Sequence, residues 1–470
     1  MNFVSFDFLL FFPVVTLIYF LLPEKFRNTW LLLSSIFFYM FLIPYYIFIL
    51  LGTISVDFIA GKYIYKENNP KRKKQLLVIS LIFNIGILFF FKYYNFFAEE
   101  LTQLVVTQNA DDFLSQVILP IGLSFHTFQS MSYTIEIYRG HCIPEKNYFR
   151  FMLFVMFYPQ LVAGPIERPQ NLLHQFNEKK TFDYNRVKSG LWLMLIGFFK
   201  KIVVADRLSI LVDSVYLNPD GFKGIPTLLA IVFFAIQIYC DFSGYTDIAR
   251  GAARVLGFNL MENFRMPYFS KSISEFWTRW HISLSSWFKD YLYIPLGGNK
   301  VNLSKVIRNV LIVFIVSGLW HGANWTFIVW GALHGLVVII ERLTRFSRSK
   351  ISNYLGTLYT FIALSILWVF FRAENMIRAF EILNNAWEFP KTGIGNQFRG
   401  LGLTINDLIL SGCFIAVIIV HDFVSQKVNI FDWVQRRTAV VRWIIYYLLV
   451  IVVIFYSENG ATKNFIYFQF

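Results

Sequence analysis

Residues 306–340 read VIRNVLIVFIVSGLWHGANWTFIVWGALHGLVVII, and this stretch decides the class of fold. It holds two successive apolar runs, 306–320 and 322–340, each close to the ~20 residues that cross a bilayer core. Comparable runs lie at 5–22, 28–43, 44–61, 77–98, 115–135, 186–205, 224–241, 356–371, 404–420 and 440–456. The pattern predicts an all-α polytopic membrane protein with about ten to twelve transmembrane helices.

The composition supports this class and excludes an ordinary soluble domain. Of the 470 residues, 56% are hydrophobic and 15% are charged, whereas soluble domains are nearer ~50% and ~25%. Three cysteines, Cys142, Cys240 and Cys413, form no CxxC motif and indicate neither a disulfide framework nor a thiolate metal site. The N-terminal MNFVSFDFLLFFPVV lacks a basic region and contains Asp7, so we expect a retained first helix rather than a signal peptide.

The distribution of positive charge predicts the orientation in the membrane. A net charge of +14 would suggest nucleic-acid binding in a soluble protein, but cytoplasmic loops rich in Lys and Arg are the simpler explanation here. With the N-terminus outside and all twelve runs crossing, about three quarters of the 43 Lys and Arg residues fall on the cytoplasmic side. We therefore predict an external N-terminus.

Two stretches do not fit simple crossings. Residues 148–175 start as an apolar run that breaks at several Pro and Gly residues, which favours a re-entrant segment. Residues 264–300 are too polar to span, and a helix there would place Trp277, Trp280, His281, Leu284 and Phe288 on one face. This pattern is typical of an amphipathic helix at the cytoplasmic interface. No internal repeat or linker divides the chain, so we predict one membrane domain over 1–470.

Polar residues inside apolar helices are costly and are therefore functional candidates. His321 and His334 both lie in the middle of the apolar region, each within a Gly-xxx-Gly spacing that lets backbone or a ligand come close. His281 is a further candidate, among tryptophans and beside Arg279. The alternatives are packing histidines satisfied by carbonyl groups and, for His281, a member of an interfacial aromatic belt.

Two more buried positions are candidates. His126 lies in a span rich in hydroxyl groups, and a hydrogen-bonded structural role is its alternative. Asp241 lies at the end of a long apolar run, where structural bonding and a cavity-lining role are both open. The sequence contains no HExxH, P-loop, dinucleotide or GxSxG motif, so we expect no metal and no bound cofactor. What remains is histidine chemistry, in which a neutral buried imidazole acts as a general base.

Six blocks carry a resemblance to a known family: LPIGLSFHTFQSMSY, FYPQLVAGPIERP, YCDFSGYTDIARG, EFWTRWHISLSSWFKDYLYIPLGGNK, SGLWHGANWTFIVWGALHG and the C-terminal FIYFQF. In this order they resemble the membrane-bound O-acyltransferase (MBOAT) family, in its bacterial AlgI-like branch of alginate O-acetyltransferase components. The resemblance covers 115–470, and residues 1–110 match only in general character. It implies a single multi-helix domain around a central tunnel, in the bacterial cytoplasmic membrane.

The resemblance also implies roles for single residues. His321, in the GLWHG block, would be catalytic, and His281, in the WHIS block, would be its companion. His126 departs from the pattern, since an aromatic residue is usual there. Candidates for contacting the substrate or lining the tunnel are Arg279, Asn324, Trp320, Asp241, Tyr245, His126 and His334.

The function implied is transfer of acetyl from cytosolic acetyl-CoA across the membrane to an extracellular or periplasmic glycan, an alginate-like exopolysaccharide. A secreted SGNH-type protein is the expected acyl-accepting partner, and nucleic acid is not expected as one. Within the family, peptidoglycan O-acetylation and D-alanyl transfer to teichoic acid remain alternatives. Outside it, a transporter or a catalytically silent scaffold is possible, although no inverted repeat typical of transporters is found.

Overall fold

The computed structural model describes residues 1–41, 44–104, 117–162, 164–344, 353–389, 398, 403–458 and 465–466, without the side chains of 99–104, 353 and 458. These residues form helices and no strand. Contacts divide the chain into two compact units, Met1–Met194 with Ala249–Met261, and Leu195–Ile248 with Glu262–Phe470. Each unit is described by itself below.

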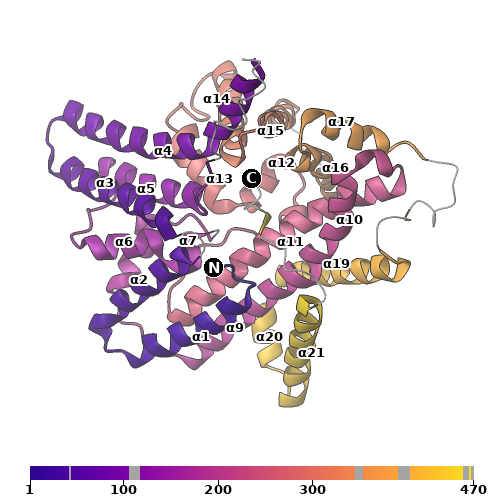
Figure 1. Cartoon of the computed structure of the whole chain (residues 1–470), viewed down its shortest axis with the longest axis horizontal. Coiled ribbons are helices and arrows are strands. Elements are labelled where there is room, and N and C mark those ends of the chain that lie inside the picture. Colours follow the sequence, from indigo (N-terminus) through magenta and orange to yellow (C-terminus); the bar gives the residue numbers. More distant parts are fainter. Residues whose placement is uncertain are drawn as a thin grey trace. The chain divides into compact units, whose positions relative to one another are not determined.

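The first unit contains the N-terminal helices, drawn from indigo to magenta in Figure 1. They are α1 (Phe6–Leu21), α2 (Glu24–Met40), η1 (Pro44–Tyr46), α3 (Ile47–Lys66), α4 (Pro70–Leu104), α5 (Leu123–Tyr138), α6 (Tyr148–Met156), α7 (Tyr158–Leu161), α8 (Pro169–Leu172), η2 (Leu173–Asn177) and most of α9 (Tyr184–Phe198). Helices α3, α4 and α5 pack against one another. Gly61 of α3 allows this, because a Cβ there would come within 2.8 Å of the Tyr133 ring on α5.

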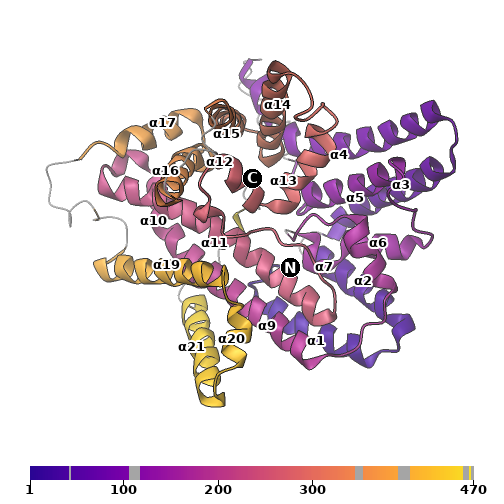
Figure 2. The ribbon, with the colours of Figure 1, turned by 180° about the vertical axis from the view of Figure 1, so that it is seen from behind.

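The second unit contains the candidate catalytic histidines predicted from the family blocks. Its helices are η3 (Phe199–Ala205), α10 (Asp206–Leu217), η4 (Pro219–Gly221), most of α11 (Ile225–Leu256), η5 (Pro267–Phe269), α12 (Ile273–Arg279), α13 (Ile282–Phe288), η6 (Lys289–Tyr293), α14 (Leu303–His321), α15 (Trp325–Leu343), α16 (Asn353–Arg372), α17 (Met376–Asn385), α19 (Ile405–Ser425), α20 (Ile430–Gln435) and α21 (Ala439–Glu458). The view from behind in Figure 2 shows the same helices, with α14 beside α15.

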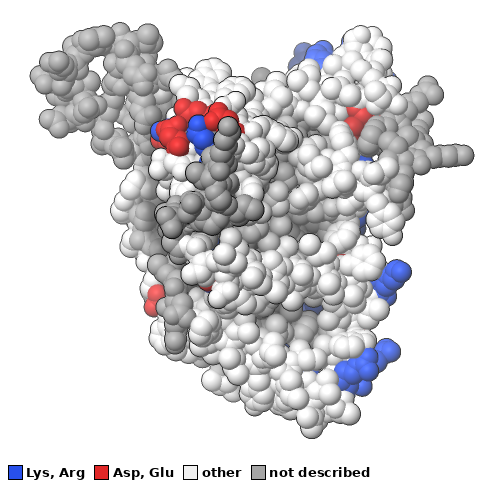
Figure 3. All heavy atoms as spheres, turned by 90° about the vertical axis from the view of Figure 1, so that its right-hand side faces the viewer, with Lys and Arg blue, Asp and Glu red and all other residues white. Residues whose placement is uncertain are grey.

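The predicted polytopic all-α membrane fold is confirmed. Among the described residues, eight helices are long and apolar enough to span a bilayer, and the shorter apolar helix α1 adds to them. Some of these helices expose their apolar side chains: on α21, Leu448 and Phe455 are each 59% exposed, an arrangement typical of contact with lipid or another protein. On the face drawn in Figure 3, the coloured Lys, Arg, Asp and Glu side chains form a few separate patches among other described residues, drawn white.

The quoted stretch 306–340 folds into a helical hairpin of α14 and α15, as its two apolar runs predict. The glycines lie where the two helices touch. A Cβ on Gly318 would clash with the backbone oxygen of Phe327, and one on Gly331 with that of Phe314. The group that approaches these glycines is therefore the backbone of the facing helix.

The interrupted stretch 148–175 is broken, as its Pro and Gly residues predict; its re-entrant position in the membrane stays a prediction. Helix α6 ends at Met156, α7 follows after Phe157, and residues 165–168 form no regular secondary structure. The carbonyl of Phe154 accepts hydrogen bonds from the amides of Gln129 and Gln160, at 2.6 and 2.7 Å. Side chains thus bind backbone that the helix break exposes within the buried interior.

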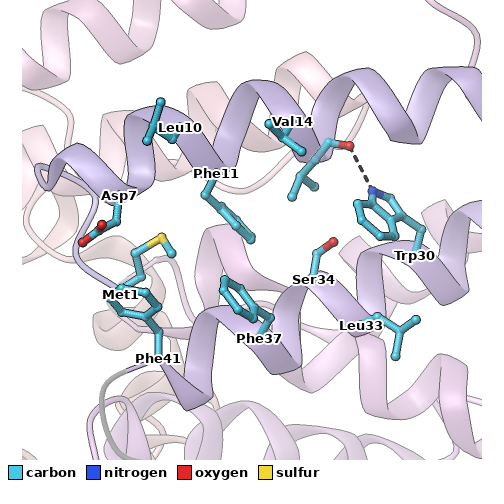
Figure 4. A pocket seen from close by; sticks show the side chains of 11 residues that line it. Met1, Asp7, Leu10, Phe11, Val14, Trp30, Leu33, Ser34, Phe37 and Phe41 are labelled. Atoms are coloured by element: carbon cyan, nitrogen blue, oxygen red, sulfur yellow. Dashed lines mark hydrogen bonds between the residues drawn. The ribbon is translucent and has the colours of Figure 1, made fainter.

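A cavity of about 580 Å³ lies between α1 and α2 (Figure 4). Its wall is apolar apart from Asp7 and Ser34, and Trp30 donates its indole N–H to the carbonyl of Val15 at 3.0 Å. None of the candidate site residues lines this cavity.

Candidate active site

The WHIS block is built differently from the continuous amphipathic helix that its periodicity predicts. Helix α12 ends at Arg279, Trp280 is extended, and α13 begins at Ile282. Between them, His281 adopts a left-handed backbone conformation with φ 43° and ψ 54°. Such a conformation costs a residue with a Cβ about 1–3 kcal/mol, so the surrounding structure must impose it. The predicted single face of Trp277, Trp280, His281, Leu284 and Phe288 is therefore wrong.

The break is stabilised by a segment that precedes the block. The N–H of Ile282 donates to the carbonyl of Asn263 at 2.9 Å, and the N–H of Ser283 donates to the Asn263 side-chain oxygen at 3.1 Å. The N–H of Arg265 donates to the carbonyl of Arg279, also at 2.9 Å. These bonds satisfy backbone groups that a continuous helix would have paired internally. Hydrophobic periodicity contains no information about such a partner.

Helix α12 is held at its other end by a buried carboxylate. Glu341, on α15, accepts hydrogen bonds from the backbone N–H groups of Ile273 and Ser274, at 2.7 and 2.9 Å, and from the Ser274 hydroxyl at 2.8 Å. A carboxylate at a helix N-terminus satisfies free N–H groups and interacts favourably with the helix dipole. Glu341 thus fixes the position of the element that precedes His281.

His281 is fully buried among aromatic rings. Its imidazole meets two rings edge to face, that of Phe242 of α11 with centroids 4.8 Å apart and that of Trp320 of α14 at 6.3 Å. Burial lowers the pKa of His281 to about 3. The ring is therefore neutral at physiological pH, a state in which one nitrogen donates and the other accepts a hydrogen bond.

His321 is the last residue of α14 and is also buried. The rings of Trp330, on α15, and Phe371, on α16, meet it edge to face at 5.1 and 5.3 Å. Trp320, which precedes it, lies 4.9 Å from its ring centroid. The Trp320 ring therefore borders both His281 and His321, and the structure brings the two predicted catalytic histidines into one aromatic cluster.

A third histidine, His334, belongs to the same cluster. Its ring lies 4.9 Å from Trp330, which in turn contacts His321. Trp277 of α12 donates its indole N–H to Nδ1 of His334 at 3.2 Å. The hydrogen-bond partner of Nδ1 of His334 is therefore an indole N–H and not the carbonyl group that its structural alternative predicts, and one ring separates His334 from His321.

Asp241 and Tyr245 connect this region to the C-terminal FIYFQF block. Asp241 is paired with the buried Lys201 at 2.5 Å and accepts a hydrogen bond from the backbone N–H of Ile466 at 2.9 Å. Tyr245 stacks on Phe465 at 4.5 Å. Phe465 also packs on Phe242, the residue that contacts His281, so the C-terminal block is one ring removed from that histidine.

The other candidates lie at the edge of the cluster or in the other unit. Arg279 is half-buried and pairs with Glu275 at 2.5 Å. Asn324 caps α15, accepting from the N–H of Thr326 and donating to the carbonyl of Glu374. His126 is buried in α5, in the first unit, and neither of its ring nitrogens has a hydrogen-bond partner among the described residues.

Sequence reasoning missed several residues that shape the site. Trp330 and Phe371 form the walls around His321, Glu341 anchors α12, and Asn263 caps α13. Aromatic residues in apolar helices carry no signal that distinguishes a wall from general packing. Glu341 had a usable signal, since it is an acidic residue at the end of an apolar run.

Eight helices of the described residues are long and apolar enough to span a bilayer, so this is a multi-pass membrane protein, and the comparisons with known proteins assign its class. Residues 141–376 match the family described as MBOAT, membrane-bound O-acyltransferase family. The chain belongs to this family and is an acyltransferase.

Three individual relatives have more specific names than the family. The chain is 37% identical over 425 residues to "Probable alginate O-acetylase AlgI" of Pseudomonas aeruginosa, covering 89% of this chain and 81% of that protein. It is 35% identical to "Peptidoglycan O-acetyltransferase" of Helicobacter pylori, and the matched region covers 79% of this chain and 77% of that protein. It is 30% identical to "Teichoic acid D-alanyltransferase" of Streptococcus thermophilus, and the matched region covers only 47% of this chain and 56% of that protein. Among these three relatives, the similarity to the alginate O-acetylase and the peptidoglycan O-acetyltransferase covers more of the chain than the similarity to the D-alanyltransferase.

Proposed function

We propose that the protein transfers acetyl from cytosolic acetyl-CoA across the bacterial cytoplasmic membrane for O-acetylation of an extracellular or periplasmic glycan, an alginate-like exopolysaccharide. The N-terminus lies outside in this proposal. The observation that carries it is the placement of His281 and His321 on the same Trp320 ring, in a chain similar to an alginate O-acetylase over most of its length.

The proposed chemistry is nucleophilic acyl transfer. His321 accepts the proton of the acceptor hydroxyl as the oxygen attacks the thioester carbonyl. The bond to sulfur then breaks, and the proton passes to the leaving CoA thiolate. His281, neutral because it is buried, donates its ring N–H to the carbonyl oxygen and stabilises the charge that develops there. The surrounding aromatic rings exclude water that would hydrolyse the thioester.

Arg279 and the basic cytoplasmic loops would bind the phosphates of CoA. Arg279 is paired with Glu275 in the present structure, so this role requires exchange of one anionic partner for another. A secreted SGNH-type protein would take the acyl group at the outer face and complete the transfer to the glycan.

The decisive experiment uses the purified full-length protein in membrane vesicles with radiolabelled acetyl-CoA. Acetyl label is expected on an added glycan or secreted acceptor, and CoA thiol is released in equal amount. The same vesicles with His321→Ala should release no thiol above background. Thiol release without any acetylated acceptor, or acetylation independent of His321, would contradict the proposal.

Peptidoglycan O-acetylation is the second candidate, because the similarity to the Helicobacter pylori enzyme covers more than three quarters of both chains. Giving the vesicles alginate-like polysaccharide and peptidoglycan fragments side by side separates the two. D-alanyl transfer is less favoured, since similarity to that relative covers less than half of this chain.

A further inference from the structure

A buried carboxylate lies in the first unit, on a helix far in sequence from the helices that carry the histidine cluster. Asp57 of α3 is fully buried in the middle of a candidate membrane span. Its two oxygens accept hydrogen bonds from Ser80 at 2.5 Å, from the amide of Asn84 at 2.9 and 3.0 Å, and from Ser130. Ser80 and Asn84 belong to α4, and Ser130 to α5, so the carboxylate joins three neighbouring helices (Figures 1 and 2).

All of these partners are neutral. Among the ion pairs of the described residues, none involves Asp57, although buried carboxylates elsewhere in the chain do pair, as Asp241 does with Lys201. Hydrogen bonds from neutral groups stabilise a buried carboxylate, but they leave its net charge uncompensated in a low-dielectric interior, where such a charge is costly. An acidic residue in such a place calls for a positive partner.

The oxygen atoms around Asp57 can bind a positively charged ion. The Thr134 hydroxyl of α5 donates to the Met131 carbonyl at 3.0 Å, and its oxygen accepts a long hydrogen bond of 3.5 Å from the Ser80 hydroxyl, so a second lone pair remains for a cation. The amide NH₂ of Asn84 faces both oxygens of Asp57, and the buried side-chain oxygen of Asn84 has no hydrogen-bond partner among the described residues. Rotation of this amide on cation binding turns the oxygen toward Asp57. Serine hydroxyls rotate and present lone pairs as readily as hydrogens. Carboxylate, hydroxyl and amide oxygens are the ligands that hard cations prefer.

The net charge of the site indicates the charge of the cation that it can bind. A single carboxylate among neutral oxygens balances one positive charge, whereas calcium sites combine several carboxylates and magnesium keeps most of its waters. We propose that Asp57, Ser80, Asn84, Ser130 and Thr134 form a binding site for Na⁺, which ties α3, α4 and α5 together. This inference does not depend on the proposed acyl transfer.

The test measures thermal unfolding of the full-length detergent-solubilised protein in chloride salts of Li⁺, Na⁺, K⁺ and choline at constant ionic strength. A site-bound ion stabilises the folded state by mass action, so Tm should rise by about 2 °C or more between low and ~200 mM Na⁺, and less with K⁺. Asp57→Asn should abolish the Na⁺ response while keeping Tm in choline close to that of the wild type. Asp183→Asn, an exposed change of the same kind, should respond like the wild type.

A second pair of variants keeps the proposal testable if Asp57→Asn does not accumulate. Thr134→Val removes one proposed ligand. It should raise several-fold the Na⁺ concentration that gives half of the increase in Tm. Thr127→Val, two turns away on the same buried helix, should not. A Tm that is the same in all four salts, or one that depends on pH but on no cation, would overturn the proposal. So would an unchanged Na⁺ response in both Asp57→Asn and Thr134→Val.

Discussion

Trp277 donates its indole N–H to Nδ1 of His334 at 3.2 Å, and the two rings meet edge to face at 5.1 Å. This bond joins the short helix α12 to the membrane-spanning helix α15. Because Nδ1 accepts, the neutral His334 ring carries its hydrogen on Nε2. Through this bond, α12, which ends just before His281, is linked to the aromatic rings that surround His321.

Trp277→Phe is therefore expected to weaken activity without abolishing it. The phenyl ring retains much of the packing but leaves Nδ1 of a buried histidine without its donor, which costs about 1–3 kcal/mol of stability. Denaturation of the purified variant and its acetylation rate in vesicles provide the measurements. Full loss of activity at unchanged stability would instead make Trp277 a substrate-contacting residue.

His321→Ala is expected to abolish acetylation while the protein still accumulates in the membrane. Loss of a general base lowers a rate by about 10²–10⁴-fold. The acetyl content of the surface glycan and the amount of protein in membranes are measured together. His174→Ala, at an exposed position, serves as the control. Activity within about threefold of the wild type would refute the role of His321 as the base.

His281→Asn is expected to reduce kcat/KM by about 10–100-fold, less than His321→Ala, because His281 orients and polarises rather than transferring a proton. Asparagine tolerates the left-handed backbone at this position better than most residues. Met266→Asn is a matched control, since Met266 shares the positive φ. If His334→Ala were inactive and His281→Asn fully active, the proposed pair of histidines would be wrong.

Stability is expected to decrease on acidification in a way that depends on His281. Burial lowers its pKa from 6.5 to about 3, so between these values the unfolded chain binds a proton that the folded chain does not. The stability contributed by neutral His281 is therefore complete above about pH 6.5 and is lost as the pH falls toward 3. His281→Asn should flatten the pH dependence by up to about 1.4 kcal/mol per pH unit in this window. Equal slopes for variant and wild type would show that His281 is solvated.

The two histidines are expected to be approached from opposite sides of the membrane. In a background without the three native cysteines, Lys289→Cys, next to α13, should react with a membrane-impermeant thiol reagent only from the cytoplasm. Ala323→Cys, two residues after His321, should react from the outside. A tag after Asn69 should be cytoplasmic, and one after Asn109, a position outside the described residues, should be external. Labelling of both cysteines from one face would contradict transfer across the membrane.

Much of the architecture follows from local sequence. The run of Val, Ile, Leu and Phe in 306–340 predicts the hairpin of α14 and α15, because each helix must satisfy its own backbone within the membrane and expose apolar side chains to lipid. The glycines predict the close contact between these helices, since only a residue without Cβ fits there. The position of His321 at the end of α14 follows from the same runs.

The arrangement of the site was decided by tertiary structure alone. The sequence near His281 reads as one amphipathic helix, yet the chain breaks there because Asn263 and Arg265 take over backbone hydrogen bonds of the block. Hydrophobic periodicity determines which face of a helix is buried, and this holds for each segment separately. Which distant group satisfies a freed N–H, and which ring meets an imidazole, depends on how segments far apart in the chain pack. For this protein, the residue types and the membrane-spanning segments were therefore encoded locally, and the meeting of His281 with Trp320 was created by folding.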